Sequence, residues 1–191
     1  MKIVFGLDEK KWNDFVYNHS KGSIFQTPYM AKVYKESEKN EPFFIAVVSE
    51  KYEILASLLA VIQKEYNGIL GNLSSRAIII GGPIIKNDNK EVLTYLLEHY
   101  NKHIKGRVIY TQIRNLYDQT ELNDVISKFG FKYEEHLNIL INLNKTEESL
   151  WKDVHTKRRN EIRRATKEGV NFKILNTLEA LKVSYNILTE V

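Results

Sequence analysis

Residues 42–65 of the chain read PFFIAVVSEKYEILASLLAVIQKE. The runs Pro42 to Ser49 and Tyr52 to Glu65 are rich in Ile, Val, Phe and Leu, and they flank a short polar turn at Glu50-Lys51. Apolar runs of this length on either side of a turn are typical of two paired strands. This stretch therefore predicts a β-hairpin.

The residues after the hairpin continue with alternating strand and helix patterns. Strands are predicted at Ala77 to Ile80 and Arg107 to Ile113, and helices at Glu91 to Ile104 and Glu121 to Phe129. From Phe131 to Leu143 apolar and polar residues alternate, which predicts a long strand of period two. Because strands and helices interleave, the fold class should be α/β (α+β), with a mixed central sheet flanked by helices.

Two helix starts are predicted before the hairpin. Asp8 can cap a short helix that ends at Lys21-Gly22. Thr27 is a good N-cap, with Pro28 at the first helical position. In this second helix Met30, Val33 and Tyr34 are expected to pack, which leaves Lys32 pointing elsewhere.

The double glycine Gly81-Gly82 before Pro83 marks a turn after the third strand. Glycine allows the backbone to approach a ligand closely, although an ordinary turn explains the same residues. It is not a phosphate loop of the Walker type, because no Gly-Lys-Ser/Thr follows.

The strand-like alternation ends before Thr146, which can cap a new helix. A basic helix, Lys157 to Lys167, follows and stops at Gly169, and a strand is predicted at Val170 to Leu175. Thr177 then caps a last helix without a stop signal. We therefore expect a first domain at residues 1–145 and the beginning of a truncated second domain at residues 146–191.

The basic helix has two faces on a helical wheel. Its core-facing side is expected to carry Trp151, Val154, Ile162 and Ala165, and Arg158 falls on the same side. A buried guanidinium is costly unless it is satisfied, so Arg158 should have an acidic partner, carbonyl acceptors or an anionic ligand. Beside this face lies a cationic stripe, Arg159, Arg163 and Lys167, for which a solvated surface is the simpler interpretation.

Composition limits the class of protein. The chain of 191 residues is 43% hydrophobic, carries a net charge of +4 and has no cysteine, which excludes disulfides, thiolate metal sites and a cysteine nucleophile. His99 and His103 form the one histidine pair at helical spacing, but a solvated helix face is favoured over a metal site, so no metal is expected. No signal peptide or membrane-spanning run is apparent, and we expect a cytoplasmic protein, at most associated with the inner face of the membrane.

Three stretches together resemble the FemAB-like family of bacterial aminoacyltransferases and acyltransferases. Residues 25–32, FQTPYMAK, resemble the family's Phe/Leu-Gln-Ser/Thr segment, and Gly81-Gly82-Pro83 is similar to its glycine-proline after a strand. Residues 128–143 and 159–170 resemble its Gly-Phe, long strand and Arg-x-x-Ile-Arg-Lys-Ala-x-x-x-Gly-Val signature. The resemblance covers nearly the whole chain.

This resemblance implies two GNAT-like domains and an amide-forming acyl transfer onto a phosphate-bearing cell-envelope precursor, of peptidoglycan or polysaccharide. The family's phosphate-holding positions correspond to Lys32 and to Arg159 or Arg163, and they give Arg158 a reason to point inward. Gly82 and Pro83 complete the expected substrate-binding residues. The whole protein would be an acyltransferase, and this fragment alone would be inactive.

The donor side of the reaction is not found in this sequence. The acyl donor would be acyl-CoA or aminoacyl-tRNA, bound through a missing domain, since no acetyl-CoA pyrophosphate loop is present and no cofactor is expected on this fragment. Met30 replaces the family's tryptophan, and Ile113-Arg114-Asn115 stands where peptidoglycan-type members can carry an acidic residue. Asp118 could substitute, although a loop aspartate is more often a turn former, so no catalytic residue is assigned.

Two other functions compete with acyl transfer. The basic helix could make the chain a non-enzymatic module that binds RNA or anionic lipid, although no aromatic residue is interleaved from Lys157 to Lys167 to stack on bases. A degenerate GNAT-like domain without activity is the third possibility.

Overall fold

The computed structural model describes residues 1–64, 74–136, 139 and 141–189. These residues divide into two compact units, Met1–Glu135 and His136–Val191. No helix among the described residues is long and apolar enough to cross a membrane.

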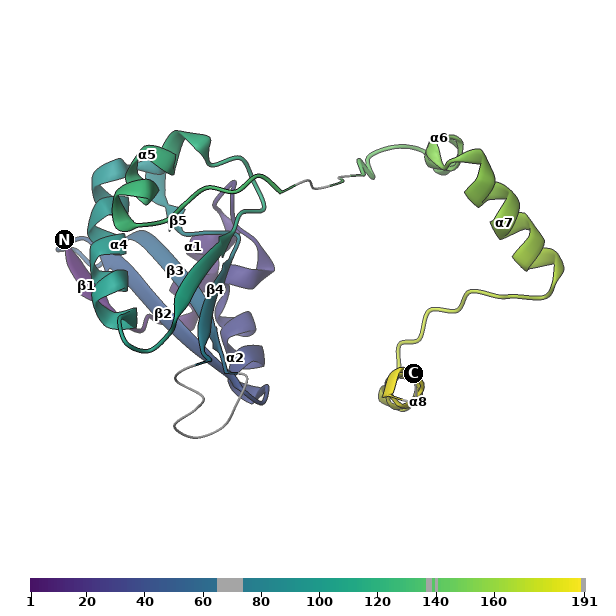
Figure 1. Ribbon diagram of the computed structural model, residues 1–191, viewed down its shortest axis with the longest axis horizontal. Helices are drawn as coiled ribbons and strands as arrows, with labels where there is room; N and C mark the ends of the chain where they lie inside the picture. The colour runs from purple at the N-terminus through teal and green to yellow at the C-terminus, as the bar shows by residue number, and fades with distance from the viewer. Residues whose placement is uncertain (65–73, 137–138, 140, 190–191) are drawn as a thin grey trace. The chain divides into compact units, whose positions relative to one another are not determined.

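The first unit is built on one sheet (Figure 1). Its strands are β1 (Lys2–Val4), β2 (Asn40–Val48), β3 (Ile54–Gln63), β4 (Arg76–Ile80), β5 (Ile84–Ile85) and β6 (Tyr110–Arg114). They lie in the order β1-β2-β3-β4-β6, with β5 paired to β3. All described pairings are antiparallel except that of β4 with β6, which is parallel. The predicted hairpin is confirmed, because β2 and β3 pair along their whole length.

Helices cover both faces of this sheet (Figure 1). The α-helices of the unit are α1 (Glu9–Tyr17), α2 (Pro28–Glu36), α4 (Lys90–Ile104) and α5 (Asn123–Ile126), and the 3-10 turns are η1 (Ile24–Gln26), η2 (Lys86–Asp88), η3 (Thr120–Leu122) and η4 (Ser127–Phe129). Helices α4 and α5 pack with Leu58 and Ile62 on one face, whereas α1 and α2 pack with Leu59 and Val61 on the other. Strands buried on both faces have continuous apolar runs, which explains the composition of β3.

Local capping signals determine where the helices begin. The Asp8 carboxylate accepts a hydrogen bond from the Lys11 backbone N–H at 3.0 Å, and the Thr27 hydroxyl accepts one from the Met30 N–H at 3.3 Å, as predicted. Tyr34 is buried in the core, but Val33 is 52% exposed, so its predicted packing is wrong.

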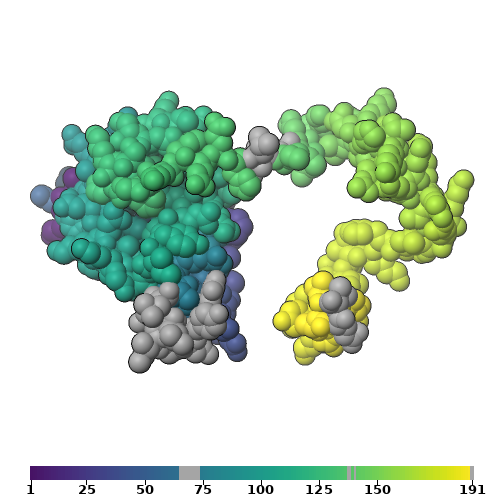
Figure 2. Space-filling view, viewed as in Figure 1, coloured from purple at the N-terminus to yellow at the C-terminus, as the bar shows by residue number. Residues whose placement is uncertain are grey.

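The predicted helix 121–129 is present as the series η3, α5 and η4 and ends at Gly130, which has a left-handed φ of 87°. Helix α5 packs against α4, and Lys90 of α4 pairs with Asp124 of α5 at 2.8 Å. Figure 2 shows the side chains of this part of the first unit, in teal and green, in close contact.

The sheet ends earlier than the sequence pattern predicts. The strand expected at 107–113 begins at Tyr110, and its residues are alternately exposed and half-buried, so one of its two faces is open to solvent. It lies at the edge of the sheet formed by the described strands. The strand expected at 131–143 is absent from its described residues, 131–136, 139 and 141–143, while residues 137, 138 and 140 lie outside the described ones. Ile139 is 93% exposed. An alternating pattern forms a strand only where a neighbour supplies hydrogen bonds, and none is paired with these described residues.

The second unit contains α6 (Glu147–Asp153), α7 (Thr156–Lys167) and α8 (Leu178–Thr189). Thr146 caps α6, and Gly169, at φ 86°, ends α7, both as predicted. The strand expected at 170–175 is not formed, since all these residues are exposed and have no strand partner. The described part of this unit therefore carries helices but no sheet.

Candidate functional site

A glycine turn lies at the carboxyl ends of the parallel strands β4 and β6. Gly81 and Gly82 have φ values of 84° and 73°, a region that residues with a Cβ rarely adopt. The Gly81 N–H donates to the Arg114 carbonyl at 2.8 Å, which fixes the start of the turn to the end of β6. Gly82 and Pro83, both predicted to bind substrate, are buried in this turn. Ligands of open α/β sheets commonly bind outside the carboxyl ends of parallel strands.

The turn is held by Gln26, whose side chain is 2% exposed. Its Nε2 donates to the carbonyl oxygens of Gly81 and Gly82 at 3.1 and 3.0 Å. Its Oε1 accepts from the backbone N–H and the hydroxyl of Ser23, both at 2.8 Å. Gln26 stands within the motif at residues 25–32, and no role was predicted for it. The sequence feature that could have indicated its role is an amide side chain directly before a Thr-Pro helix start.

Two further amide side chains surround the same turn. Gln119 is 4% exposed, and its Nε2 donates to the Gly81 carbonyl at 3.2 Å. The Oε1 of Gln119 and the Oδ1 of Asn115 are buried and have no hydrogen-bond partner among the described residues. A Cβ built on Gly82 would lie 3.2 Å from each of these two oxygens. The turn is therefore closed by amide side chains, and two of their acceptor oxygens are buried without a partner among the described residues.

Lys32 projects from α2 away from the buried face of that helix, as predicted. Its Nζ pairs with the Glu9 carboxylate of α1 at 2.7 Å, and the two side chains are 58% and 61% exposed. Helix α2 begins directly after Gln26, so the Gly81-Gly82 turn and the base of this helix are tied together.

The expectation that Arg158 points into a core is wrong. The helical wheel assumed one helix from Trp151 to Ala165, but the chain breaks at Val154 and His155, so the two segments do not share one phase. Arg158 has a 73% exposed side chain and pairs with Glu161 at 2.7 Å, so the expected acidic partner is present although the burial is not. This contact is an ordinary pair one helical turn apart and does not indicate a ligand.

Arg159 and Arg163 occupy different environments on α7. The guanidinium of Arg159 donates to the Trp151 and Lys152 carbonyls at 3.4 and 3.1 Å, and so satisfies carbonyl groups at the end of α6. Arg163 is exposed, with its guanidinium carbon 5.9 Å from the ring centroid of Trp151. Arg163 is therefore the more accessible of the two cations.

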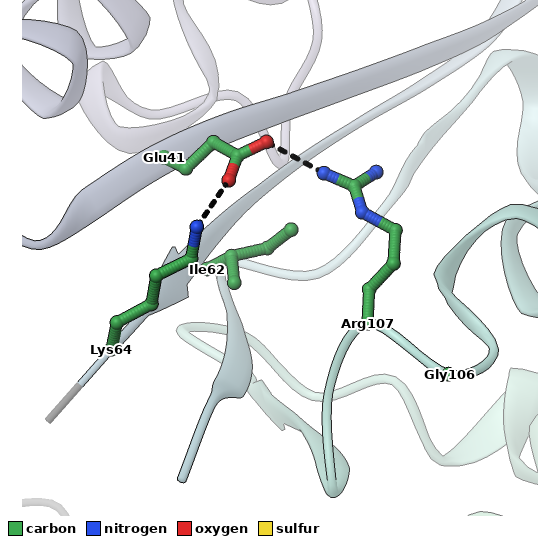
Figure 3. Close-up of a pocket in the computed structure, with 5 residues that line it drawn as sticks. All are labelled: Glu41, Ile62, Lys64, Gly106 and Arg107. Atoms are coloured by element: carbon green, nitrogen blue, oxygen red, sulfur yellow. Dashed lines mark hydrogen bonds and ion pairs between the residues drawn. The ribbon is translucent and has the colours of Figure 1, made fainter. Parts of the chain in front are cut away.

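A separate hollow of about 240 Å³ lies at the other end of the sheet, where β4 and β6 begin. It is lined by Glu41, Ile62, Lys64, Gly106 and Arg107 (Figure 3). Both Lys64 and Arg107 contact the carboxylate of Glu41 in this view. None of these residues was predicted as a site residue.

Few groups near the Gly81-Gly82 turn could move a proton. Asp118 accepts from the Thr120 hydroxyl and N–H at 2.6 and 2.9 Å, and these hydrogen bonds lower the pKa of its carboxyl group. A lowered pKa makes Asp118 a weaker base and suits its role as a turn former. No group of three or more His, Asp or Glu side chains gathers as a potential metal site in the described parts of the chain.

Comparisons with known proteins agree on the fold. No protein-family model and no curated protein sequence matches the chain. Among solved structures, FemX is similar with a TM-score of 0.59 and 18% sequence identity, over 87% of this chain and 44% of FemX. A transcriptional regulator from Bacillus halodurans C-125 is similar with a TM-score of 0.52 and 15% identity, over 73% of this chain and 99% of the regulator.

Glucosamine-6-phosphate N-acetyltransferase from Arabidopsis thaliana has a TM-score of 0.50 and 13% identity, over 75% of this chain and 98% of that enzyme. The chain spans less than half the length of FemX. Identities this low indicate a shared fold. The chain has a GNAT-like fold, with a central, mostly antiparallel sheet flanked by helices.

Proposed function

We propose that this chain is part of a FemAB-like acyl- or aminoacyltransferase that forms an amide on a phosphate-bearing cell-envelope precursor, peptidoglycan or polysaccharide. The observation that carries the proposal is the structural likeness to FemX, which extends over 87% of this chain. Residues 1–145 are proposed as the first GNAT-like domain and residues 146–191 as the opening of a second. The acyl donor would be acyl-CoA or aminoacyl-tRNA, bound by other parts of the whole protein, which would work in the cytoplasm.

The proposal assigns the acceptor's phosphates to cationic side chains. Lys32 on the first unit and Arg163 on the second are exposed, and each is proposed by itself to donate a charge-assisted hydrogen bond, of about 1.5–3 kcal/mol, to a phosphate oxygen. Arg159 is the weaker candidate of the α7 pair, because its guanidinium already binds the carbonyl groups at the end of α6. Arg158 stays a further candidate, because its exposed side chain pairs with Glu161 in the same way as Lys32 pairs with Glu9.

Gly82 and Pro83 are kept in the proposal as the turn beside which the acceptor would bind. The unpartnered oxygens of Gln119 and Asn115 are buried against Gly82, where even a Cβ would lie 3.2 Å from each, so they are closed to a substrate amine. Amide oxygens are also too weakly basic to deprotonate an ammonium group, so neither side chain is assigned as a general base.

The test is a calorimetric titration of this chain with UDP-linked muropeptide and with simple UDP-sugars. We expect saturable binding that weakens at least tenfold in Lys32→Ala and in Arg163→Ala. Lys35→Ala and Arg164→Ala are the matched controls, since both residues are exposed cations on the same two helices. Absence of binding by the folded chain, or equal losses in variants and controls, would contradict the assignment.

One observation favours a second function, binding of RNA by α7. The residues of this helix are largely exposed, and its cations Lys157, Arg163, Arg164 and Lys167 face solvent. A phosphate-binding helix loses affinity steeply as salt is added. RNA affinity that falls with salt and that is lost in Arg164→Ala as well as in Arg163→Ala would support this function over acyl transfer.

A further inference from the structure

We propose that the hollow in Figure 3 is a binding site for a phosphate group, held by Lys64 and Arg107. The hollow is distinct from the Gly81-Gly82 turn, because it lies where β4 and β6 begin and the turn lies where they end. The proposal does not depend on acyl transfer.

The charges around the hollow are unequal. The carboxylate of Glu41 accepts one hydrogen bond from Arg107 Nη2 at 2.7 Å and one from Lys64 Nζ at 3.0 Å. Among the described residues that line the hollow, two cations and one anion leave a net charge of +1. A guanidinium has five N–H donors and an ammonium three, and among the described residues each side chain makes this one hydrogen bond. Donors of both cations therefore remain for an anion.

The guanidinium of Arg107 lies over the aromatic ring of Phe43. Its central carbon lies 5.2 Å from the ring centroid of Phe43, a buried residue that in turn packs against Tyr100 with ring centroids 5.8 Å apart. Attraction to the face of an aromatic ring restrains the position of a guanidinium group. A ligand would thus meet a cation that needs little ordering.

The size of the hollow and the exposure of its two cations suit a compact oxyanion. The side chains of Lys64 and Arg107 are 37% and 38% exposed, so a solute can reach them. The hollow of about 240 Å³ exceeds the share of one water molecule, about 30 Å³. Gly106 has no atom within 4 Å of the position of a Cβ, which keeps that side of the hollow open. A tetrahedral phosphate presents several oxygens and can accept from a guanidinium and an ammonium at once.

The experiment follows backbone amide NMR shifts of the whole chain during titration with inorganic phosphate and, separately, methyl phosphate, at constant ionic strength. We expect saturable shifts at Gly106 and Arg107. Lys64→Met and Arg107→Gln should each weaken binding at least tenfold. Glu41→Gln keeps both cations and removes the competing charge, so it should strengthen binding about threefold or more. Equal affinity for methyl phosphate would identify a site for phosphate esters, and preference for inorganic phosphate a site for the free ion.

The matched control is Lys90→Met. Lys90 pairs with Asp124 at 2.8 Å, is 51% exposed and carries the same charge as Lys64. Its replacement should leave phosphate affinity within twofold. Equal losses in Lys64→Met and Lys90→Met would mean an adventitious ion only, and would overturn the proposal. Weaker binding in a folded Glu41→Gln variant would overturn it too, because the carboxylate would then be organising the cations and not competing for them.

Discussion

Gln26 and Gly82 are joined by a hydrogen bond of 3.0 Å from the side-chain Nε2 to the backbone carbonyl, across 56 positions of sequence. Gln26 is 2% exposed, and its other hydrogen bonds connect the same side chain to Ser23 and Gly81. One amide therefore fastens the start of α2 to the turn at the ends of the parallel strands.

We predict that Gln26→Leu destabilises the first unit by about 2–4 kcal/mol, because the Gly82 carbonyl and the Ser23 N–H lose their hydrogen bonds to this side chain. Urea unfolding followed by circular dichroism measures the change. The control is Gln112→Leu, in which the replaced side chain lies on the exposed side of β6 and accepts one hydrogen bond, from Arg114. The control should change the free energy of unfolding by less than about 0.5 kcal/mol. Equal effects of the two replacements would contradict a holding role for Gln26.

The packing at Gly82 gives a second prediction. Gly82→Ala would place a Cβ 2.7 Å from Gln119 Nε2, whereas Gly106→Ala meets no atom within 4 Å. Both glycines have a positive φ, 73° and 78°, so backbone strain of about 1–2 kcal/mol is common to the two variants. Gly82→Ala should therefore cost about 1 kcal/mol more than Gly106→Ala, the value of the Gln119 hydrogen bond that must shift. Thermal unfolding of both variants measures the difference, and equal costs would show that the turn has room for a side chain.

Alkaline pH should destabilise the first unit through Tyr100. Burial raises the pKa of this phenol to about 12 from 10.0, and its hydroxyl lies 3.0 Å from that of Thr111. Between pH 10 and 12 the unfolded chain loses this proton while the folded chain keeps it, so the free energy of unfolding falls as the pH rises. Two pKa units correspond to about 2–3 kcal/mol.

The variant Tyr100→Phe isolates this effect, because other tyrosines and lysines titrate in the same range in both proteins. At pH 8 it should be less stable than the parent by about 1 kcal/mol, the value of the lost hydrogen bond. That deficit should shrink and then reverse toward pH 12. A difference between the two proteins that stays constant from pH 8 to 12 would exclude Tyr100 as the titrating group.

Local sequence signals predicted much of the first unit. The β2–β3 hairpin, the caps at Asp8 and Thr27 and the helix stop at Gly130 each depend on residues a few positions apart, and the structure confirms them. The predictions that depend on contacts with distant parts of the chain were wrong. The alternation at 131–143 has the period of a strand, but a strand forms only against a neighbouring strand. The helical wheel that placed Arg158 on a buried face assumed a continuous helix, and the chain interrupts that helix at Val154 and His155.

The candidate site was less predictable than the fold. Gly82 and Pro83 could be identified as a turn, because glycine and proline punctuate a sequence. The sequence does not distinguish Gln26, Asn115 and Gln119 from other polar residues. Their place at the Gly81-Gly82 turn is seen only in the folded chain. The hollow at Arg107 could not be predicted, since Glu41 and Arg107 are 66 positions apart and meet when the sheet forms.

The ion pair between Lys32 and Glu9 leads to a last prediction about the proposed acceptor site. The two side chains are 2.7 Å apart and mostly exposed, so the pair itself contributes at most about 1 kcal/mol to stability. If Lys32 holds a phosphate, the Glu9 carboxylate competes with that phosphate, and Glu9→Gln should tighten binding of UDP-linked muropeptide about two- to fivefold. Calorimetry measures the affinity, with Glu36→Gln as the control, because Glu36 is an exposed carboxylate at the end of α2. A gain in Glu9→Gln alone assigns the effect to Lys32. The same gain in both variants would instead reflect the net charge of the chain, and the phosphate contact would then have to be sought on Arg163.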